Sequence, residues 1–285
     1  MRFAQLVMGP AGAGKSTFCS SVARHAEVAK RIVNLVNLDP ACEYFDYSPV
    51  LDVRDLIHVD DVMEDEELRL GPNGGLIFCL EYLIRNPSWL TEQLIDTPDD
   101  EYFIFDCPGQ IELYTHLDVM KRFSEMLVGL DFRQVENAFM LKPLRVCGVY
   151  LIEAQFMVDT HKFFSGVLSA LSCMVNLELP FVCILSKMDL LNSAGRRKIA
   201  DFVDSSAQAL LDDSREAQLN PRFEALSRAL ARVVDDFSLV RFVPLNIRNE
   251  ESIADALMFI DNAIQYGEDL DVKTAEFEYP DPDDC

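Results

Sequence analysis

One short stretch of the sequence decides the fold: residues 9–16 are GPAGAGKS. An apolar run of strand length, residues 3–8, precedes it and a segment of helical period, residues 16–29, follows it, which is the context that the pattern G-x-x-x-x-G-K-S requires. Its glycines let backbone amides surround phosphate oxygens, its lysine adds positive charge, and its serine hydroxyl can bind Mg²⁺. The sequence therefore favours a nucleotide-phosphate site over a glycine-rich turn that binds nothing. The expected site residues are Gly9, Pro10, Ala11, Gly12, Ala13, Gly14, Lys15, Ser16 and Thr17.

Apolar runs of strand length alternate with segments of helical period along the rest of the chain. This alternation predicts an α/β fold with a mostly parallel sheet and helices on both faces, and together with the phosphate loop it predicts a P-loop NTPase. The expected strands are residues 3–8, 32–38, 102–105, 146–152, 181–185 and 240–244, and the expected helices are 16–29, 75–85, 113–130, 163–175, 223–237 and 252–266.

Three regions do not follow this rhythm. Residues 193–236 are helical and charged, and we expect them to form a helical lobe inserted into a single domain that spans residues 1–267. Residues 268–285 hold eight acidic residues against Lys273, so we expect a disordered acidic tail. The connection 39–73 is long, and such connections usually carry function or extra helices.

Charge and cysteine content exclude several classes of function. Lys and Arg number 25 and Asp and Glu 48, a formal net charge of −23. Nucleic acids and anionic membranes attract surfaces rich in Lys and Arg, so we expect no direct nucleic-acid partner and no membrane. The eight cysteines are scattered without a metal-binding spacing, which predicts reduced thiols in the cytosol or nucleus.

Acidic residues end two of the expected strands. Asp39 follows the second strand and Asp106 the third, and ligands of open α/β sheets bind beyond such strand ends. Three apolar residues before Asp106 resemble a Walker-B strand, which would place this carboxylate near Mg²⁺ together with Ser16; capping of the next turn is the alternative. Gly109 could bring a backbone amide to the γ-phosphate, and Gln110 could orient the attacking water. Glu112 could assist, or only favour the first turn of a helix.

The sequence SKMD at residues 186–189 ends the fifth expected strand. The pattern [NT]-K-x-D at this place recognises guanine, because the Asp accepts hydrogen bonds from guanine N1–H and N2–H₂ and adenine lacks that pair of donors. Ser186 replaces the usual Asn or Thr, and Lys187 can lay its methylene stem over the base. With the phosphate loop, Asp189 predicts GTP and GDP rather than ATP. Asn246, after the last strand, is a further candidate base contact.

Five strings together, GPAGAGKST, NLDPA, EDEELRLGPNGG, DCPGQIELYTH and SKMDLL, resemble the GPN-loop GTPases. The strings FMV at 156–158 and QYGEDL at 265–270 are most similar to the third eukaryotic paralogue of that family. The resemblance implies that Asp106, Gln110 and Glu112 surround the catalytic water and that Asp39 lies near Mg²⁺. It also implies a dimer, with itself or with a paralogue, in which Asn73 contacts the partner's phosphate site in trans.

Further implications of the resemblance concern the cell. Eukaryotic family members act in assembly and nuclear import of RNA polymerase II, so its subunits or assembly factors are expected partners, and the third paralogue pairs with the first. Residues 134–145 depart from the family pattern and suggest an insertion.

Two other functions remain open from the sequence. A small-molecule P-loop kinase would need an Arg-rich lid, and only the cluster 196–198 offers one. A binding-only dimer subunit, stabilised by nucleotide, is the second alternative.

Overall fold

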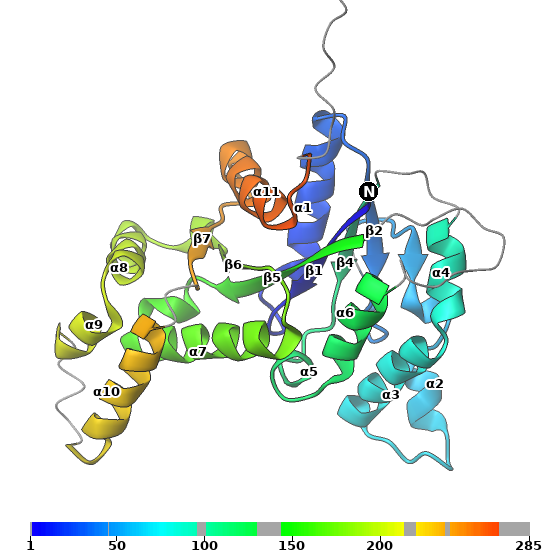
Figure 1. Cartoon of the computed structure of the whole chain (residues 1–285), viewed down its shortest axis with the longest axis horizontal. Helices are drawn as coiled ribbons and strands as arrows, with labels where there is room; N and C mark the ends of the chain where they lie inside the picture. The colour runs from blue at the N-terminus through cyan, green and yellow to red at the C-terminus, as the bar shows by residue number, and fades with distance from the viewer. Residues whose placement is uncertain are drawn as a thin grey trace, which may run out of the picture.

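The protein is described here by a computed structural model that covers residues 2–44, 46–95, 101–129, 144–213, 221–236 and 240–267. Within these ranges the strands form one seven-stranded sheet in the order β3-β2-β4-β1-β5-β6-β7, and every pairing is parallel (Figure 1). The strands are β1 (Arg2–Met8), β2 (Val33–Asn37), β3 (Leu51–Asp52), β4 (Tyr102–Asp106), β5 (Leu144–Glu153), β6 (Phe181–Ser186) and β7 (Phe242–Pro244).

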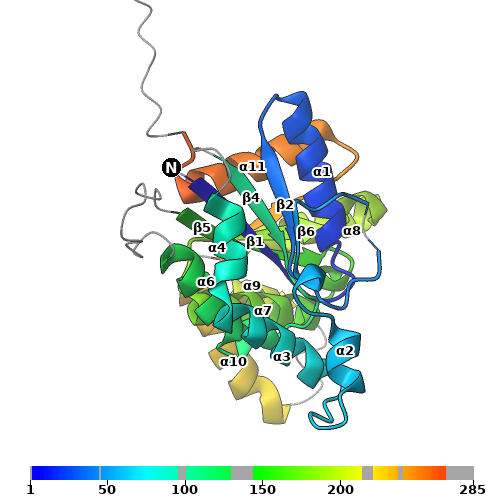
Figure 2. The same ribbon diagram turned by 90° about the vertical axis from the view of Figure 1, so that its right-hand side faces the viewer.

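Helices cover both faces of the sheet. Side chains alternate along β1, so that Phe3 and Val7 join the core under α1 and α11 while Leu6 and Met8 join the core under α3, α6 and α7 (Figure 2). Both faces of the strands are therefore buried, which explains their nearly continuous apolar sequence. The helices are α1 (Lys15–Val28), α2 (Val59–Glu64), α3 (Pro72–Arg85), α4 (Pro87–Ile95), α5 (Glu112–Thr115), α6 (Val119–Gly129), α7 (Thr160–Leu177), α8 (Ser193–Asp204), α9 (Ala207–Asp213), α10 (Pro221–Asp236) and α11 (Glu250–Ile264).

The expected helix over residues 113–130 is wrong, because the structure divides it into α5 and α6. The Asn176 side chain of α7 donates to the carbonyl oxygens of Tyr114 and Leu117, at 2.9 and 3.0 Å, and so satisfies two acceptors at the break. A contact from a distant helix therefore compensates for a break that the local sequence pattern does not reveal.

Residues 144 and 145, assigned to an insertion from the sequence, belong to β5, where Leu144 pairs with Arg2. The rest of the segment 134–145 lies outside the described residues, as does the acidic tail 268–285. Within the long connection 39–73 the structure has strand β3 and helix α2, and α4 follows α3; the strand and helix pattern did not predict these three elements.

The segment 193–236 includes α8, α9 and α10, which lie on the side of the sheet where β7 is the edge strand (Figure 1). The Asp235 carboxylate of α10 accepts hydrogen bonds from the backbone amides of Ala207 and Gln208, at 2.7 and 3.2 Å, and caps α9. The rings of Phe163 in α7 and Phe202 in α8 lie 5.2 Å apart and join the segment to the core. Within the described ranges, no helix has the length and apolar character needed to cross a membrane.

Candidate functional site

The phosphate loop links β1 to α1 at the carboxyl end of the sheet. Gly9, Gly12 and Gly14 have φ angles of 140°, 79° and 88°, a region that side-chain-bearing residues rarely adopt. At Gly9 a Cβ atom would also lie 2.3 Å from the carbonyl oxygen of Leu151, so only glycine fits there. Lys15 is buried and donates to the carbonyl oxygens of Gly9 and Pro10, at 3.2 and 3.3 Å. The sequence motif therefore forms the curved loop that its chemistry needs.

Asp106 ends β4 next to this loop and is 4% exposed. Its carboxylate accepts a hydrogen bond from the Tyr47 hydroxyl at 2.8 Å, and the Ser16 hydroxyl lies beside it. Burial raises the pKa of Asp106, while the Ser16 and Tyr47 hydroxyls and the charge of Lys15 oppose the rise. The Asp106 carboxylate and the Ser16 hydroxyl together offer two oxygen ligands of the kind that Mg²⁺ prefers.

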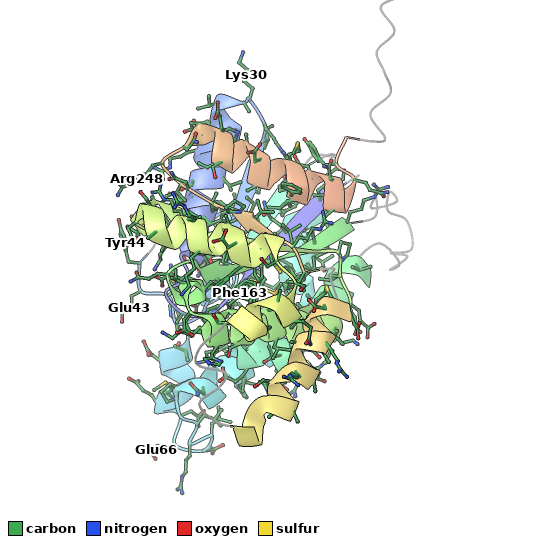
Figure 3. The ribbon with its side chains drawn as sticks, turned by 90° about the vertical axis from the view of Figure 1, so that its left-hand side faces the viewer. Lys30, Glu43, Tyr44, Glu66, Phe163 and Arg248 are labelled. Carbon is green, nitrogen blue, oxygen red and sulfur yellow. The ribbon has the colours of Figure 1, made fainter. Side chains whose placement is uncertain are left out.

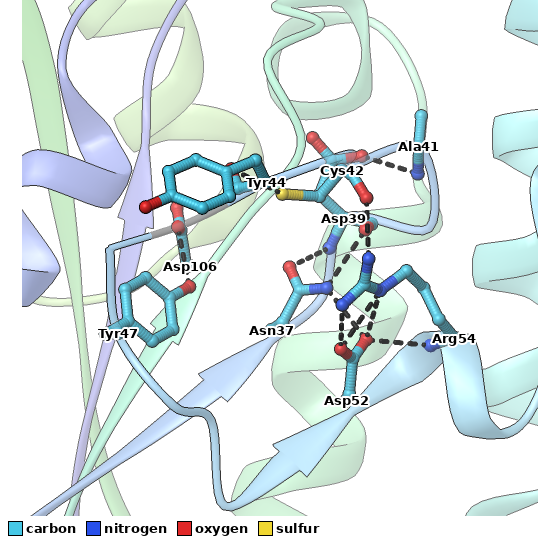
Figure 4. Close-up of polar contacts among 9 residues, drawn as sticks. All are labelled: Asn37, Asp39, Ala41, Cys42, Tyr44, Tyr47, Asp52, Arg54 and Asp106. Atoms are coloured by element: carbon cyan, nitrogen blue, oxygen red, sulfur yellow. Dashed lines mark hydrogen bonds and ion pairs between the residues drawn. The ribbon is translucent and has the colours of Figure 1, made fainter.

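Asp39 follows β2 at the start of a tightly held segment (Figure 4). The Asn37 side chain accepts from the Asp39 amide at 3.0 Å and donates to the Asp39 carbonyl at 3.1 Å. The Asn37 side-chain amide also donates to the Asp52 carboxylate at 2.9 Å. The Arg54 guanidinium donates to Asp52 and to the carbonyl oxygen of Cys42. Burial raises the pKa of Asp39, and the Ala41 amide and the charges of Lys15 and Arg54 lower it.

The segment after Asp106 packs on the phosphate loop. A Cβ on Gly109 would lie 3.0 Å from Cα of Ala11, so the backbone at Gly109 closely approaches the loop. Gln110 donates through Nε2 to Oδ1 of Asn73 in the same chain, at 2.9 Å. Asn73 lies in the first turn of α3, so this bond brings the GPN turn to the edge of the site. Glu112 is exposed and is the first residue of α5.

Ser186 joins the base-recognition motif to the phosphate loop. Its side chain is 3% exposed, and Oγ donates to the carbonyl oxygen of Ala13 at 2.7 Å and lies 3.2 Å from that of Ile152. A serine at the first position of the motif, where Asn or Thr is usual, therefore still forms a hydrogen bond to the phosphate loop. Lys187 has a left-handed backbone, with φ 59°, and its ammonium group lies 3.2 Å from the Glu153 carboxylate.

Asp189 follows in a short 3₁₀ turn (Met188–Leu190), and its side chain is 10% exposed. Oδ2 lies 3.3 Å from Nε of Arg248, which comes from the loop after β7 and projects at the same edge of the molecule as Tyr44 and Glu43 (Figure 3). In that loop Asn246 accepts from the Arg248 amide at 2.9 Å. The loop therefore lies over the base-recognition motif.

Arg196 of α8 donates to the carbonyl oxygens of Met188 and Asp189, at 3.2 and 3.4 Å. It therefore supports the base-recognition turn, and these contacts give no support to a kinase lid.

No sequence pattern marks several residues of the site. Tyr47, Arg54 and Arg248 belong to no motif, and their partners are distant in the sequence or lie in irregular segments. Among the described residues, no group of three or more His, Cys, Asp and Glu could hold a metal ion. A cation at Ser16 and Asp106 would therefore need further ligands, such as the phosphates of a nucleotide.

Known proteins resemble this chain over most of its length. A family model described as a conserved hypothetical ATP binding protein matches residues 7–266. Three curated relatives are named GPN-loop GTPase 3. The protein of Danio rerio is 51% identical over 95% of this chain and 91% of its own, and that of Mycosarcoma maydis is 47% identical over 95% of each chain. The protein of Dictyostelium discoideum is 45% identical over 96% of this chain and 91% of its own.

A solved structure, an apo-form GTPase from Pyrococcus abyssi, aligns with a TM-score of 0.71 over 93% of this chain and 98% of its own, at 20% identity. That likeness concerns the fold. The parallel sheet, the phosphate loop and the acidic strand end define a P-loop nucleotide-binding protein. Within that class, the chain belongs to the GPN-loop GTPases, the family of its relatives, and is a GTP-binding and GTP-hydrolysing protein.

Proposed function

We propose that this chain is a Mg²⁺-dependent GTPase switch of the GPN-loop type, with slow turnover, that works as a dimer in assembly and nuclear import of RNA polymerase II. The hydrogen bond between Gln110 and Asn73 carries the proposal, because it joins the residue expected to orient water to the GPN turn. Gly109, next to Gln110, packs on Ala11 of the phosphate loop, so both side chains lie at the edge of the site where the γ-phosphate would bind.

The donor set supports the requirement for Mg²⁺. Ser16 and Asp106 supply the hydroxyl and carboxylate oxygens that Mg²⁺ prefers, and the phosphates of GTP would complete its coordination. When bound, the ion would neutralise charge that develops on the transferred phosphoryl group. Asp39 carries a second, half-buried carboxylate near Lys15 and could hold a water of the same ion.

The position of Asn73 supports the dimer. It lies at the start of α3, where Pro72 restricts the backbone, and its side chain is exposed at the rim of the site. A second protomer, either another copy or a paralogue, could exchange the contact between Asn73 and Gln110 for one across the interface. The cellular role, the polymerase partners and the shuttling between cytoplasm and nucleus are proposed from family membership.

A subunit-mixing experiment tests the trans role of Asn73. Asn73→Ala removes the exposed amide, and Lys15→Ala removes the phosphate-binding ammonium group. If Asn73 acts in trans, the mixed dimer has both defects in one site and an intact second site, so GTP hydrolysis recovers. If Asn73 acts in cis, both sites carry a defect.

The mixture is compared with each variant alone, after native mass spectrometry has verified subunit exchange. Hydrolysis that stays at the level of the variants would reject the trans role. Wild-type protein that binds GTP and turns it over at no measurable rate would favour the binding-only subunit instead. Co-purification with polymerase subunits, with GTP or GDP in the bound fraction, tests the cellular role.

A further inference from the structure

Tyr47 makes a contact with the site that the GTPase motifs do not account for. Its hydroxyl donates to Oδ2 of Asp106 at 2.8 Å, although the two residues are 59 positions apart (Figure 4). Tyr47 lies between β2 and β3, and its partly buried ring packs against the core under α1 and α11. The ring is therefore anchored by packing, while the hydroxyl group reaches the carboxylate.

This hydrogen bond restricts the orientation of a buried carboxylate. With Oδ2 held by Tyr47, and with the Ser16 hydroxyl beside the carboxylate, Asp106 cannot rotate without losing the Tyr47 donor. Buried charge is costly when its hydrogen bonds are lost, so the observed orientation is strongly preferred. Partners that orient a metal-binding carboxylate in this way commonly affect metal affinity as well.

The segment that carries Tyr47 is also fixed at other points. The Asn37 side chain holds Asp39, Arg54 holds the carbonyl oxygen of Cys42 at 2.8 Å, and the Val50 amide donates to Leu35 at 2.7 Å. Tyr47 lies between the last two of these anchors. A change at Asp106 could therefore reach the middle of the segment through Tyr47 while the anchors hold.

We propose that Tyr47 is a positioning residue for Asp106, and that through this hydrogen bond the described residues around it, 42–44 and 46–50, respond to Mg²⁺ at the nucleotide site. This inference rests on the proposed Mg²⁺ dependence. It gives the segment a defined role: the hydroxyl orients Asp106 toward the ion, and engagement of Asp106 orders the backbone around Tyr47.

The chain offers a matched pair of variants. Tyr47→Phe removes only the hydroxyl and retains the ring that packs on the core. Tyr44→Phe makes the same chemical change in the same segment, at a side chain that is 80% exposed and projects from the surface (Figure 3). Any effect of the hydroxyl at Asp106 should appear in the first variant and not in the second.

The first measurement is the Mg²⁺ concentration that half-maximally slows release of fluorescent GDP, titrated from EDTA. We expect this concentration to rise about tenfold in Tyr47→Phe and to stay at the wild-type value in Tyr44→Phe. The second is hydrogen exchange of backbone amides in residues 42–44 and 46–50. In wild type and Tyr44→Phe, Mg²⁺ with GDP should slow this exchange relative to EDTA with GDP, and Tyr47→Phe should show no such slowing.

The outcomes separate this inference from the function on which it rests. Wild-type protein that releases GDP equally fast with and without Mg²⁺ would overturn both. A wild-type Mg²⁺ dependence that Tyr47→Phe retains unchanged would overturn the inference alone. If Tyr47→Phe failed to fold, the wild-type exchange would still decide, because exchange of residues 42–44 and 46–50 that does not respond to Mg²⁺ contradicts the coupling.

Discussion

The hydroxyl of Ser186 gives the sharpest test of how the base-recognition motif is joined to the phosphate loop. Ser186→Ala removes a 2.7 Å hydrogen bond to the carbonyl oxygen of Ala13, and both residues are almost fully buried. A buried carbonyl that loses a donor costs about 1–3 kcal/mol, more than the net value of an ordinary exposed hydrogen bond. We therefore expect the free energy of unfolding to fall by about 1–3 kcal/mol.

Nucleotide affinity should fall as well, because Ala13 belongs to the loop that surrounds the phosphates. If about half of this loss, roughly 0.5–1.5 kcal/mol, came from the loop in its nucleotide-binding conformation, GDP affinity would fall about twofold to tenfold, since each 1.4 kcal/mol is a factor of ten. Ser186→Thr keeps a hydroxyl and should retain most of both properties.

Urea unfolding gives the stability, and titration with fluorescent GDP gives the affinity. Ser165→Ala is the matched control, because Ser165 is exposed and its hydroxyl donates within α7 to the His161 carbonyl at 3.0 Å. Surface changes of that kind usually stay within about 0.5 kcal/mol. Ser186→Ala that matches Ser165→Ala in both measurements would refute the reasoning.

Three further predictions follow from the site. Gly9→Ala should lower the free energy of unfolding in urea far more than Gly12→Ala, because a Cβ at Gly9 meets the Leu151 carbonyl. Gly12 faces open space, so its substitution adds only the strain of its φ angle, about 1–2 kcal/mol. Equal losses in the two variants would contradict this. Asp189→Asn should shift preference from GTP toward xanthosine triphosphate in competition binding, and wild-type affinity that is equal for GTP and ATP would argue against base recognition here. The pKa of Asp106 is raised in the fold from its ordinary 3.8, so the protonated carboxyl stabilises the fold fully below that value, and this stabilisation is lost as pH rises through the raised pKa. Asp106→Asn should therefore raise the unfolding temperature at pH 7 in EDTA. A lowered temperature would contradict this.

The sequence alone predicted the parts of this protein that depend on local pattern. The order of strands and helices followed from apolar runs and helical periods, and the parallel sheet followed from their alternation. The phosphate loop was equally predictable, because its glycines and Lys15 lie within eight consecutive residues and their spacing alone produces the required backbone. Short-range patterns of this kind carry their geometry with them.

Elements stabilised by distant partners were beyond the sequence. The break between α5 and α6 is compensated by Asn176 of α7, about 60 residues away, and no local signal marks it. Strand β3 has two residues and exists because Leu51 and Asp52 pair with β2. Such short elements bury too little to form a recognisable period.

The connections within the site were decided by the tertiary structure alone. The sequence placed Ser186 in one motif and Ala13 in another, but only the parallel order of β1, β5 and β6 brings this hydroxyl to that carbonyl oxygen, across 173 residues. Tyr47 had no signal at all, since a tyrosine in a long connection resembles any other until its hydroxyl is found 2.8 Å from Asp106. A motif states which groups can act, whereas packing of the whole chain determines which groups hold them in place.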